Sequence, residues 1–132
     1  MGVATGDFNN DGCIDLYVTV LGPNQLFKNN CDGTFTDVSK QSGTDDPGWS
    51  VSATFFDYDR DGYLDLFVAN YVDLDLKTTP KPGSSRNCEW KGMIVACGPR
   101  GLPTGHNALY HNNRDGTFTD VSEAAGILKP GG

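Results

Sequence analysis

Short apolar stretches, rich in β-branched and aromatic residues, alternate along this chain with polar turns rich in glycine, aspartate and asparagine. This pattern is typical of short β-strands joined by tight turns. It predicts eight strands and an all-β fold. The expected strands are residues 2–6, 15–20, 25–29 and 34–38, followed by residues 50–56, 65–70, 107–112 and 117–121.

The eight predicted strands form two copies of one pattern. The block from Asp32 to Ser39 recurs unchanged from Asp115 to Ser122. In each copy an Asp-Gly pair lies between the third and fourth strands, which is a strong signal for a hairpin turn. Four-stranded units that recur at roughly fifty residues are typical of β-propeller blades. The sequence therefore predicts two four-stranded blades, residues 1–47 and residues 48–132.

Two further expectations follow from the repeat. We expect Asp32 and Asp115 to be turn residues, because their neighbours lack acids at the spacing of an ion site. We also expect a helical turn after each fourth strand, with Ser39 or Ser122 as its N-cap.

The turn between the first and second strands of each copy carries acids at alternate positions. The first loop is residues 7–15 and the second loop is residues 57–65. Each has oxygen-bearing side chains at positions 1, 3, 5 and 9 and a glycine at position 6. Ca²⁺ prefers six to eight hard oxygen ligands, and glycine allows the sharp turn that aims them inward.

The sequence thus predicts two Ca²⁺ sites. The expected side-chain ligands are Asp7, Asn9, Asp11 and Asp15 in the first loop, and Asp57, Asp59, Asp61 and Asp65 in the second. The backbone carbonyls of Cys13 and Tyr63 are expected at position 7. The loops are not EF-hands, because Val18 and Val68 replace the bidentate Glu at position 12. The alternative is two solvated acidic turns without an ion, in which the clustered carboxylates would repel one another.

Composition and charge narrow the class of protein. The 132 residues suit a single ordinary domain. The net charge of −7 argues against a nucleic acid or an anionic membrane surface as partner. Seven of the 17 acids lie in the two loops, so bound ions would explain much of the acidity. No apolar run approaches the roughly 20 residues that span a membrane.

Three motifs make the chain resemble FG-GAP or VCBS calcium-loop propeller repeats. They are residues 6–18, residues 29–38 and the Cys-Gly-Pro-Arg-Gly-Leu-Pro run at 97–103. The sequence is similar to bacterial cartilage-acidic-protein-like proteins, which often carry an ASPIC/UnbV domain. The Phe-Gly and Gly-Ala-Pro strings that name the repeat are absent, and Asn9 replaces an acid at position 3 of the first loop. We therefore expect the first site to be the weaker one.

Two blades cannot close a propeller, which has typically four to eight. The sequence therefore predicts a fragment of a larger propeller, or a unit that associates with other blades.

An insertion of roughly residues 71–105 separates the second and third strands of the second copy. It carries five basic and three acidic residues, net +2, so the rest of the chain is −9. Long loops on a rigid scaffold often carry function. Trp90, Lys91 and Arg100 are our partner-binding candidates, because aromatic and basic side chains anchor interfaces or stack on sugars. The alternative is that the insertion packs on a neighbouring blade or fills the propeller channel.

The four cysteines are expected to form two disulfides. If residues 15–20 and 25–30 pair with residue 14 opposite residue 31, Cys13 lies beside Cys31. The second copy has Tyr63 and Arg114 there, so both cysteines are absent together. Cys88 and Cys97 would close the insertion. These bonds imply an oxidising compartment, hence an extracellular, cell-surface or periplasmic location. A zinc site is the alternative, although no Cys-x-x-Cys pair occurs.

No catalytic motif is evident. The two histidines, His106 and His111, lie near no nucleophile motif, and His111 aligns with Lys28, a position that we expect at the surface. Paired carboxylates could serve a glycosidase, but here they have the spacing of ion ligands. We therefore expect a non-catalytic, calcium-binding extracellular module for protein or glycan binding or for cell adhesion. The alternative is a purely structural array or filament unit that calcium makes rigid.

Overall fold

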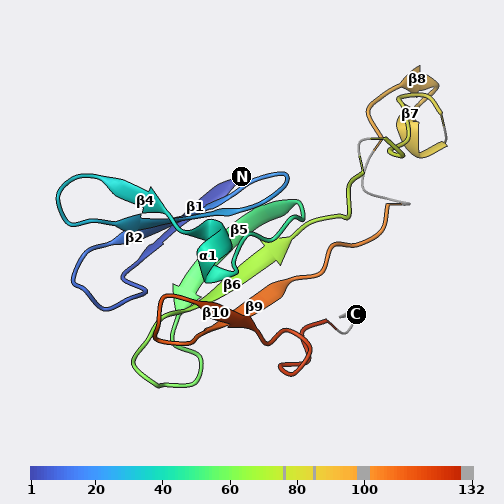
Figure 1. The fold of residues 1–132 in the computed structure, drawn as a ribbon. Coiled ribbons are helices and arrows are strands. Elements are labelled where there is room, and N and C mark those ends of the chain that lie inside the picture. Colours follow the sequence, from blue (N-terminus) through green and yellow to red (C-terminus); the bar gives the residue numbers. More distant parts are fainter. Residues whose placement is uncertain (76, 85, 98–101, 129–132) are drawn as a thin grey trace.

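The first four strands form one antiparallel sheet in chain order (Figure 1). The computed structural model describes residues 1–75, 77–84, 86–97 and 102–128. The strands of this first sheet are β1 (Gly2–Gly6), β2 (Asp15–Thr19), β3 (Gln25–Asn29) and β4 (Phe35–Asp37). The first loop connects β1 to β2, and a hairpin around Gly33 connects β3 to β4.

The second antiparallel sheet repeats this arrangement, in the order β5-β6-β9-β10. Its strands are β5 (Ser50–Phe56), β6 (Asp65–Asn70), β9 (Ala108–Asn112) and β10 (Phe118–Asp120). All eight strands expected from the sequence are confirmed, each to within one residue at either end. The all-β prediction is therefore confirmed for the two sheets.

A short helix follows the first sheet, but its expected cap is wrong. Helix α1 (Ser39–Ser42) begins after Val38, and no side chain caps it. The Ser39 hydroxyl instead donates to Asp37 and accepts the backbone N–H of Leu26 at 2.9 Å. Ser122 makes the equivalent contacts with Asp120 and Leu109, in a segment of turns. Both serines tie the end of the fourth strand to the third strand.

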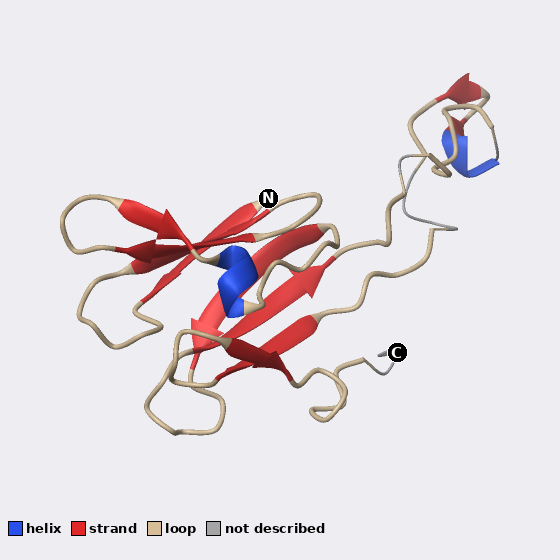
Figure 2. Ribbon diagram, viewed as in Figure 1, coloured by secondary structure: helices blue, strands red, loops and turns tan. Residues whose placement is uncertain are grey.

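The insertion between β6 and β9 forms a small separate element. It contains the 3₁₀ turn η1 (Arg86–Cys88) and a hairpin of β7 (Glu89–Trp90) and β8 (Met93–Ile94). Figure 2 shows this element at the end of two extended segments, away from both sheets. Among the described residues, no helix has the length and apolar character needed to cross a membrane.

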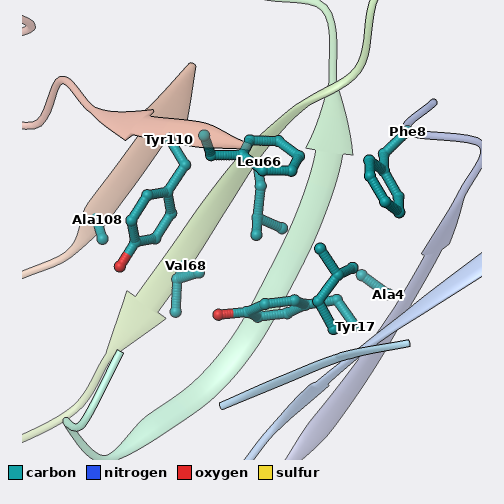
Figure 3. Close-up of a cluster of buried hydrophobic side chains, with 9 residues drawn as sticks. Ala4, Phe8, Tyr17, Leu66, Val68, Ala108 and Tyr110 are labelled. Atoms are coloured by element: carbon teal, nitrogen blue, oxygen red, sulfur yellow. The ribbon is translucent and has the colours of Figure 1, made fainter. Parts of the chain in front are cut away.

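One hydrophobic core lies between the two sheets (Figure 3). Ala4, Tyr17 and Leu26 come from one face of the first sheet, and residues such as Leu66, Val68 and Tyr110 come from the second. Alternate residues of a strand point to opposite faces, so each sheet contributes one face to this core.

The two sheets contribute opposite faces to the core. They pack head to tail, which means that one face of the first sheet lies against the opposite face of the second. In the second sheet the core face comprises Ala53, Phe55, Leu66, Val68, Ala108, Tyr110 and Phe118. The positions equivalent to these in the first sheet are exposed or half-buried: Val3, Thr5, Leu16, Val18, Gln25, Phe27 and Phe35. The first sheet therefore leaves uncovered the face that the second sheet uses to pack against it. We call the seven residues of this first-sheet surface the open face.

Candidate calcium sites

The two loops share one pattern of hydrogen bonds from backbone N–H groups to side-chain oxygens. In the first loop the Asp11 N–H points to Asp7 Oδ1 at 3.1 Å and to Asn9 Oδ1 at 3.3 Å. In the second loop the Asp61 N–H points to Asp57 Oδ1 at 3.0 Å and Asp59 Oδ1 at 3.2 Å. The side-chain oxygens of positions 1 and 3 therefore converge over the backbone of position 5.

The glycine at position 6 permits this convergence. Gly12 and Gly62 both have a φ of +86°, a conformation that glycine adopts without strain. Their N–H groups donate to the position-1 carboxylates, Gly12 to Asp7 at 2.8 Å and Gly62 to Asp57 at 3.0 Å. The turn thus holds the carboxylate of position 1 in a fixed orientation.

The position-9 carboxylates are buried and tie the loops to the sheets. Asp15 and Asp65 are 0% exposed. Asp15 accepts the N–H of Phe8 at 3.1 Å and that of Asn29 at 2.8 Å. Asp65 accepts the N–H groups of Tyr58 and Asn112 at the same two distances. Burial raises the pKa of Asp15, against these hydrogen bonds, and the nearby Asp11 and Asp7 carboxylates raise it further.

The second loop gathers the larger number of carboxylates. Ligand atoms of Asp57, Asp59 and Asp61 lie within 4.8 Å of one another, and those of Asp59, Asp65 and His111 do so as well. His111 Nδ1 is 3.4 Å from Asp59 Oδ2 and 3.3 Å from Asp65 Oδ1. This donor set is dominated by oxygen and fits Ca²⁺, while the imidazole offers a nitrogen at its margin.

The first loop carries one charge fewer. Asn9 replaces an acid at position 3, and its amide donates to Asp11 Oδ2 at 2.8 Å. Lys28 Nζ is 3.6 Å from the same oxygen. Hydrogen bonds from Asn9 and from the Cys13 N–H lower the pKa of Asp11, with a smaller contribution from Lys28. The oxygen donors again fit Ca²⁺, with less negative charge to attract it.

An arginine partly neutralises the second loop. Arg114 Nε and a terminal guanidinium nitrogen donate to Asp61 Oδ2 at 2.9 and 2.7 Å. This guanidinium, followed by the Tyr63 N–H, lowers the pKa of Asp61. Arg114 also lies over the Tyr63 ring, 5.4 Å from its centroid. The residue thus holds both position 5 and position 7 of the second loop.

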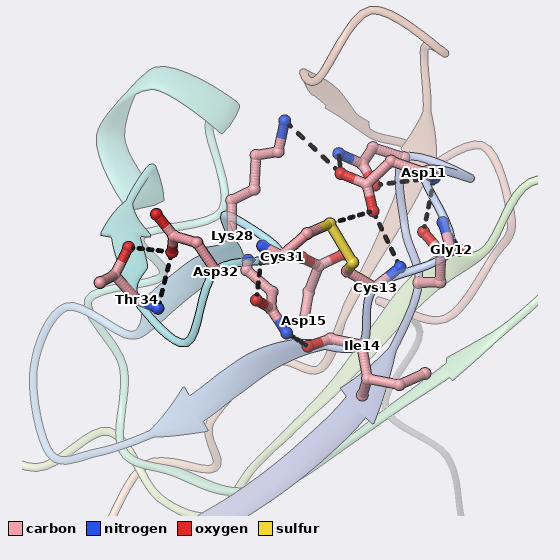
Figure 4. The surroundings of a disulfide bond; sticks show 12 residues. Asp11, Gly12, Cys13, Ile14, Asp15, Lys28, Cys31, Asp32 and Thr34 are labelled. Carbon is pink, nitrogen blue, oxygen red and sulfur yellow. Dashed lines mark hydrogen bonds and ion pairs between the residues drawn. A yellow bond between two sulfur atoms is a disulfide. The ribbon is translucent and has the colours of Figure 1, made fainter.

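The Cys13–Cys31 disulfide occupies the same place in the first loop (Figure 4). The prediction of this bond is confirmed, but the expected strand register is wrong. Leu16 pairs with Phe27, so the ladder extends to place residue 14 opposite residue 29. A shift of two residues keeps every side chain on its face, and the loop ends still bring the two cysteines together.

All four cysteines are in disulfides, so the zinc alternative is wrong. Cys88–Cys97 is the second predicted bond, and it closes the insertion.

The insertion presents its candidate partner residues on the β7–β8 hairpin. Trp90 is 63% exposed, and Lys91 Nζ lies 5.8 Å from the centroid of its ring. Met93 and Ile94 are exposed beside them. Arg100, the third candidate, lies outside the described residues.

Four residues that face the loops were missed by sequence reasoning. Lys28 and His111 were expected to be ordinary surface residues, and Arg114 and Asn112 were given no role. The two copies of the repeat contained a signal for these positions. Lys28 and His111 are basic residues at equivalent positions, and Asn29 and Asn112 are asparagines at the next position of each copy. Only the folded arrangement shows that these positions face the acidic loops.

Comparison with known proteins supports the repeat. Residues 7–68, which include both loops, match the model of the FG-GAP-like repeat family. Over 74 residues the chain is 36% identical to cartilage acidic protein 1 of Xenopus tropicalis and of Homo sapiens, and 35% identical to that of Mus musculus. The alignment covers 53% of this chain and 11% of each relative, so the chain spans a small part of their length. The predicted resemblance is confirmed, and all three relatives are vertebrate proteins.

Proposed function

We propose that this chain is a calcium-binding, non-catalytic repeat module of an extracellular protein. One observation carries the proposal: two loops fifty residues apart hold the side-chain oxygens of positions 1 and 3 at the backbone N–H of position 5. In the second loop the carboxylate of position 5 lies within 4.8 Å of them. Two disulfides and an FG-GAP-like repeat suit a secreted protein.

In this proposal each ion joins the first two strands of its blade. The first three ligand positions follow β1 or β5, and the position-9 carboxylate begins β2 or β6. An ion held between them replaces the mutual repulsion of the carboxylates by attraction. The role of the ion is thus to stabilise the blade, and we assign no catalytic step to the acids.

Thermal unfolding with Ca²⁺ and with a chelator tests this role. Calcium at a hundredfold excess over Kd adds about 2.7 kcal/mol per site if only the folded state binds. We expect Asp57→Asn to remove the contribution of the second loop. Asp115→Asn is the matched control, because it removes the same charge from the Asp-Gly turn outside both loops. An unchanged melting temperature in calcium would contradict the proposal.

The open face supports the further proposal that each sheet is one blade of a larger propeller. Its apolar residues are equivalent to those that the second sheet contributes to the core. A third sheet of the same kind could therefore pack on the open face, in the way that the first sheet packs on the second. This observation also favours the alternative function, a structural array unit.

A charged substitution on the open face tests this packing. Val18→Asp should leave calcium-dependent stability intact and abolish any calcium-dependent self-association measured by light scattering. Association that persists in the variant would contradict packing through this face.

For the binding role we propose the insertion as the contact surface for protein or glycan. Its exposed Trp90 and Lys91 lie on a disulfide-closed hairpin away from both sheets. We expect Trp90→Ala with Lys91→Ala to abolish binding in a panel of glycans and matrix proteins. Val51→Ala, at an exposed apolar residue of β5, is the control. If the panel gives no ligand for the native chain while calcium drives assembly, the structural alternative is favoured.

A further inference from the structure

Asn112, at the end of β9, bridges the two loops by hydrogen bonds. The Asn112 side-chain amide donates to the carbonyl of Phe8 in the first loop at 2.7 Å, and to that of Leu64 in the second loop at 2.9 Å. Its backbone N–H donates to Asp65 Oδ1 at 2.8 Å. One residue therefore contacts position 2 of one loop and positions 8 and 9 of the other.

A second bond crosses between the loops near their tips. Asn10, at position 4 of the first loop, donates from its side-chain amide to the carbonyl of Gly62 at 3.0 Å. Gly62 is position 6 of the second loop, between two predicted ligand positions. The two cross-links thus reach the backbone carbonyls on both sides of Tyr63, at position 7 of the second loop.

The Asn112 link is buried, so breaking it is costly. Asn112 is 1% exposed, and both hydrogens of its amide are used in bonds to the two carbonyls. A buried polar group that loses its partner pays its full desolvation penalty. Movement of either loop that breaks this bond is therefore opposed by the other loop.

The equivalent residue in the first sheet separates the local role from the cross-link. Asn29 donates to the carbonyl of Ile14 at 3.0 Å, as Asn112 does to Leu64, and its carbonyl oxygen accepts the N–H of Cys31 as that of Asn112 accepts the N–H of Arg114. The bond from Asn112 to Phe8 is the addition. It joins residues 104 apart in the sequence.

We propose that Asn112 and Asn10 couple the two ion loops, so that an ion in one loop raises the affinity of the other. This inference rests on the proposed calcium binding. An ion fixes the backbone of its loop, and the cross-links pass part of that order to the neighbouring loop. The second ion then binds a loop that is already partly ordered, so its binding causes a smaller loss of conformational entropy. By linkage, the effect is equal in both directions.

Terbium luminescence can follow the second loop separately in the full chain. Tyr58 and Tyr63 lie in this loop and can sensitise a bound Tb³⁺ ion, whereas the first loop has Phe8 and Cys13 at the equivalent positions. Tyr63→Phe should reduce the signal and so identifies the loop that it reports. The first loop is disabled by Asp7→Asn with Asp11→Asn.

We expect the disabled first loop to weaken Tb³⁺ binding in the second loop about fivefold or more, within the usual range of coupling between sites. With Asn10→Ala or Asn112→Ala already present, the same disabling pair should change the affinity by a smaller factor than in the native chain, and with both substitutions by less than twofold. Asn29→Ala should keep the full coupling. Because Asn10 is exposed, Asn10→Ala tests the idea even if Asn112→Ala fails to fold.

Failure of the coupling and failure of ion binding give different results. Equal Tb³⁺ affinity with the first loop intact or disabled overturns the coupling and leaves the sites in place. Weaker binding when the first loop is intact, through repulsion between the two ions, also overturns it. Absence of both sensitised luminescence and a calcium-dependent melting shift would instead contradict the proposed function.

Discussion

The first and second loops share a backbone but are tied to their sheets by different chemistry. In the first loop a disulfide joins Cys13 at position 7 to Cys31 in the β3–β4 turn. In the second loop Arg114, at the position equivalent to Cys31, binds Asp61 and covers Tyr63. Cys31 and Arg114 have φ values of 63° and 65°, so the two ties start from the same left-handed turn.

The difference has electrostatic consequences for ion binding. A disulfide holds the loop without using a ligand oxygen or altering the local charge. The Arg114 guanidinium holds it by occupying Asp61 Oδ2, and it cancels one negative charge. The first loop therefore has a covalent tie, three carboxylates and Lys28 at 3.6 Å from Asp11, whereas the second has four carboxylates and an arginine that hydrogen-bonds to Asp61.

Removal of the covalent tie should give the largest effect. Cys13→Ser with Cys31→Ser opens a bond between residues 18 apart, which we expect to cost about 3 kcal/mol of unfolding free energy. For a chain of this size that corresponds to a melting temperature lower by roughly 10 °C. Calorimetry in a chelator measures it, and calcium titration should show a loss of affinity that is larger in the first loop than in the second.

The second disulfide provides the control for this prediction. Cys88→Ser with Cys97→Ser opens the insertion, which lies away from both loops. We expect calcium affinity to be unchanged in this variant. Equal losses of affinity in the two double variants would mean that the Cys13–Cys31 bond has no special effect on the first loop.

An exchange of the position-3 residues should give the next largest effect. Asn9→Asp gives the first loop the donor set of the second, and Asp59→Asn does the reverse. One unit charge near a bound ion at a partly solvated site changes the binding free energy by more than 1 kcal/mol, so we expect about a tenfold change in Kd, tighter for Asn9→Asp and weaker for Asp59→Asn.

Calorimetric titration of the two single variants measures the exchange. The double variant should restore two sites of unequal affinity in reversed order. A loop that keeps its affinity in its single variant would show that position 3 contributes no ligand there.

The sequence predicted the strands because each segment occurs twice. The apolar stretch after each loop and the Asp-Gly hairpin support one another, so the boundaries of β1, β6 and the other strands of both sheets came within one residue. Asp32 and Asp115 are confirmed as turn residues, since each carboxylate accepts the N–H two residues later, from Thr34 and Thr117. These features depend on local sequence, and the same local pattern occurs in both copies of the repeat.

The missed features depend on contacts between distant segments. Asn112 reaches Phe8 only because the sheets pack head to tail, and no local pattern encodes that packing. The capping role assigned to Ser39 failed for a similar reason: its hydroxyl bonds to the Leu26 N–H, 13 residues earlier, instead of to the helix that follows. For the proposed ion sites the donor residues are predictions from the sequence, whereas the positions of the basic residues Lys28, His111 and Arg114 beside the loops became evident only from the fold.

Removal of the arginine tie should give the smallest effect, with opposite signs in the two states of the second loop. Arg114→Gln deletes the ion pair with Asp61, so we expect a small decrease in melting temperature in a chelator, because the Arg114 end of the pair is exposed to solvent and such pairs contribute little. It also frees Asp61 Oδ2 and restores a negative charge, so calcium should bind a few-fold more tightly.

Arg60→Gln is the matched control, since it removes a positive charge from position 4 of the same loop, where no ion pair is found among the described residues. Calcium titrations of both variants separate direct competition at Asp61 from the general effect of charge, and an equal gain of affinity in the two would rule out the competition.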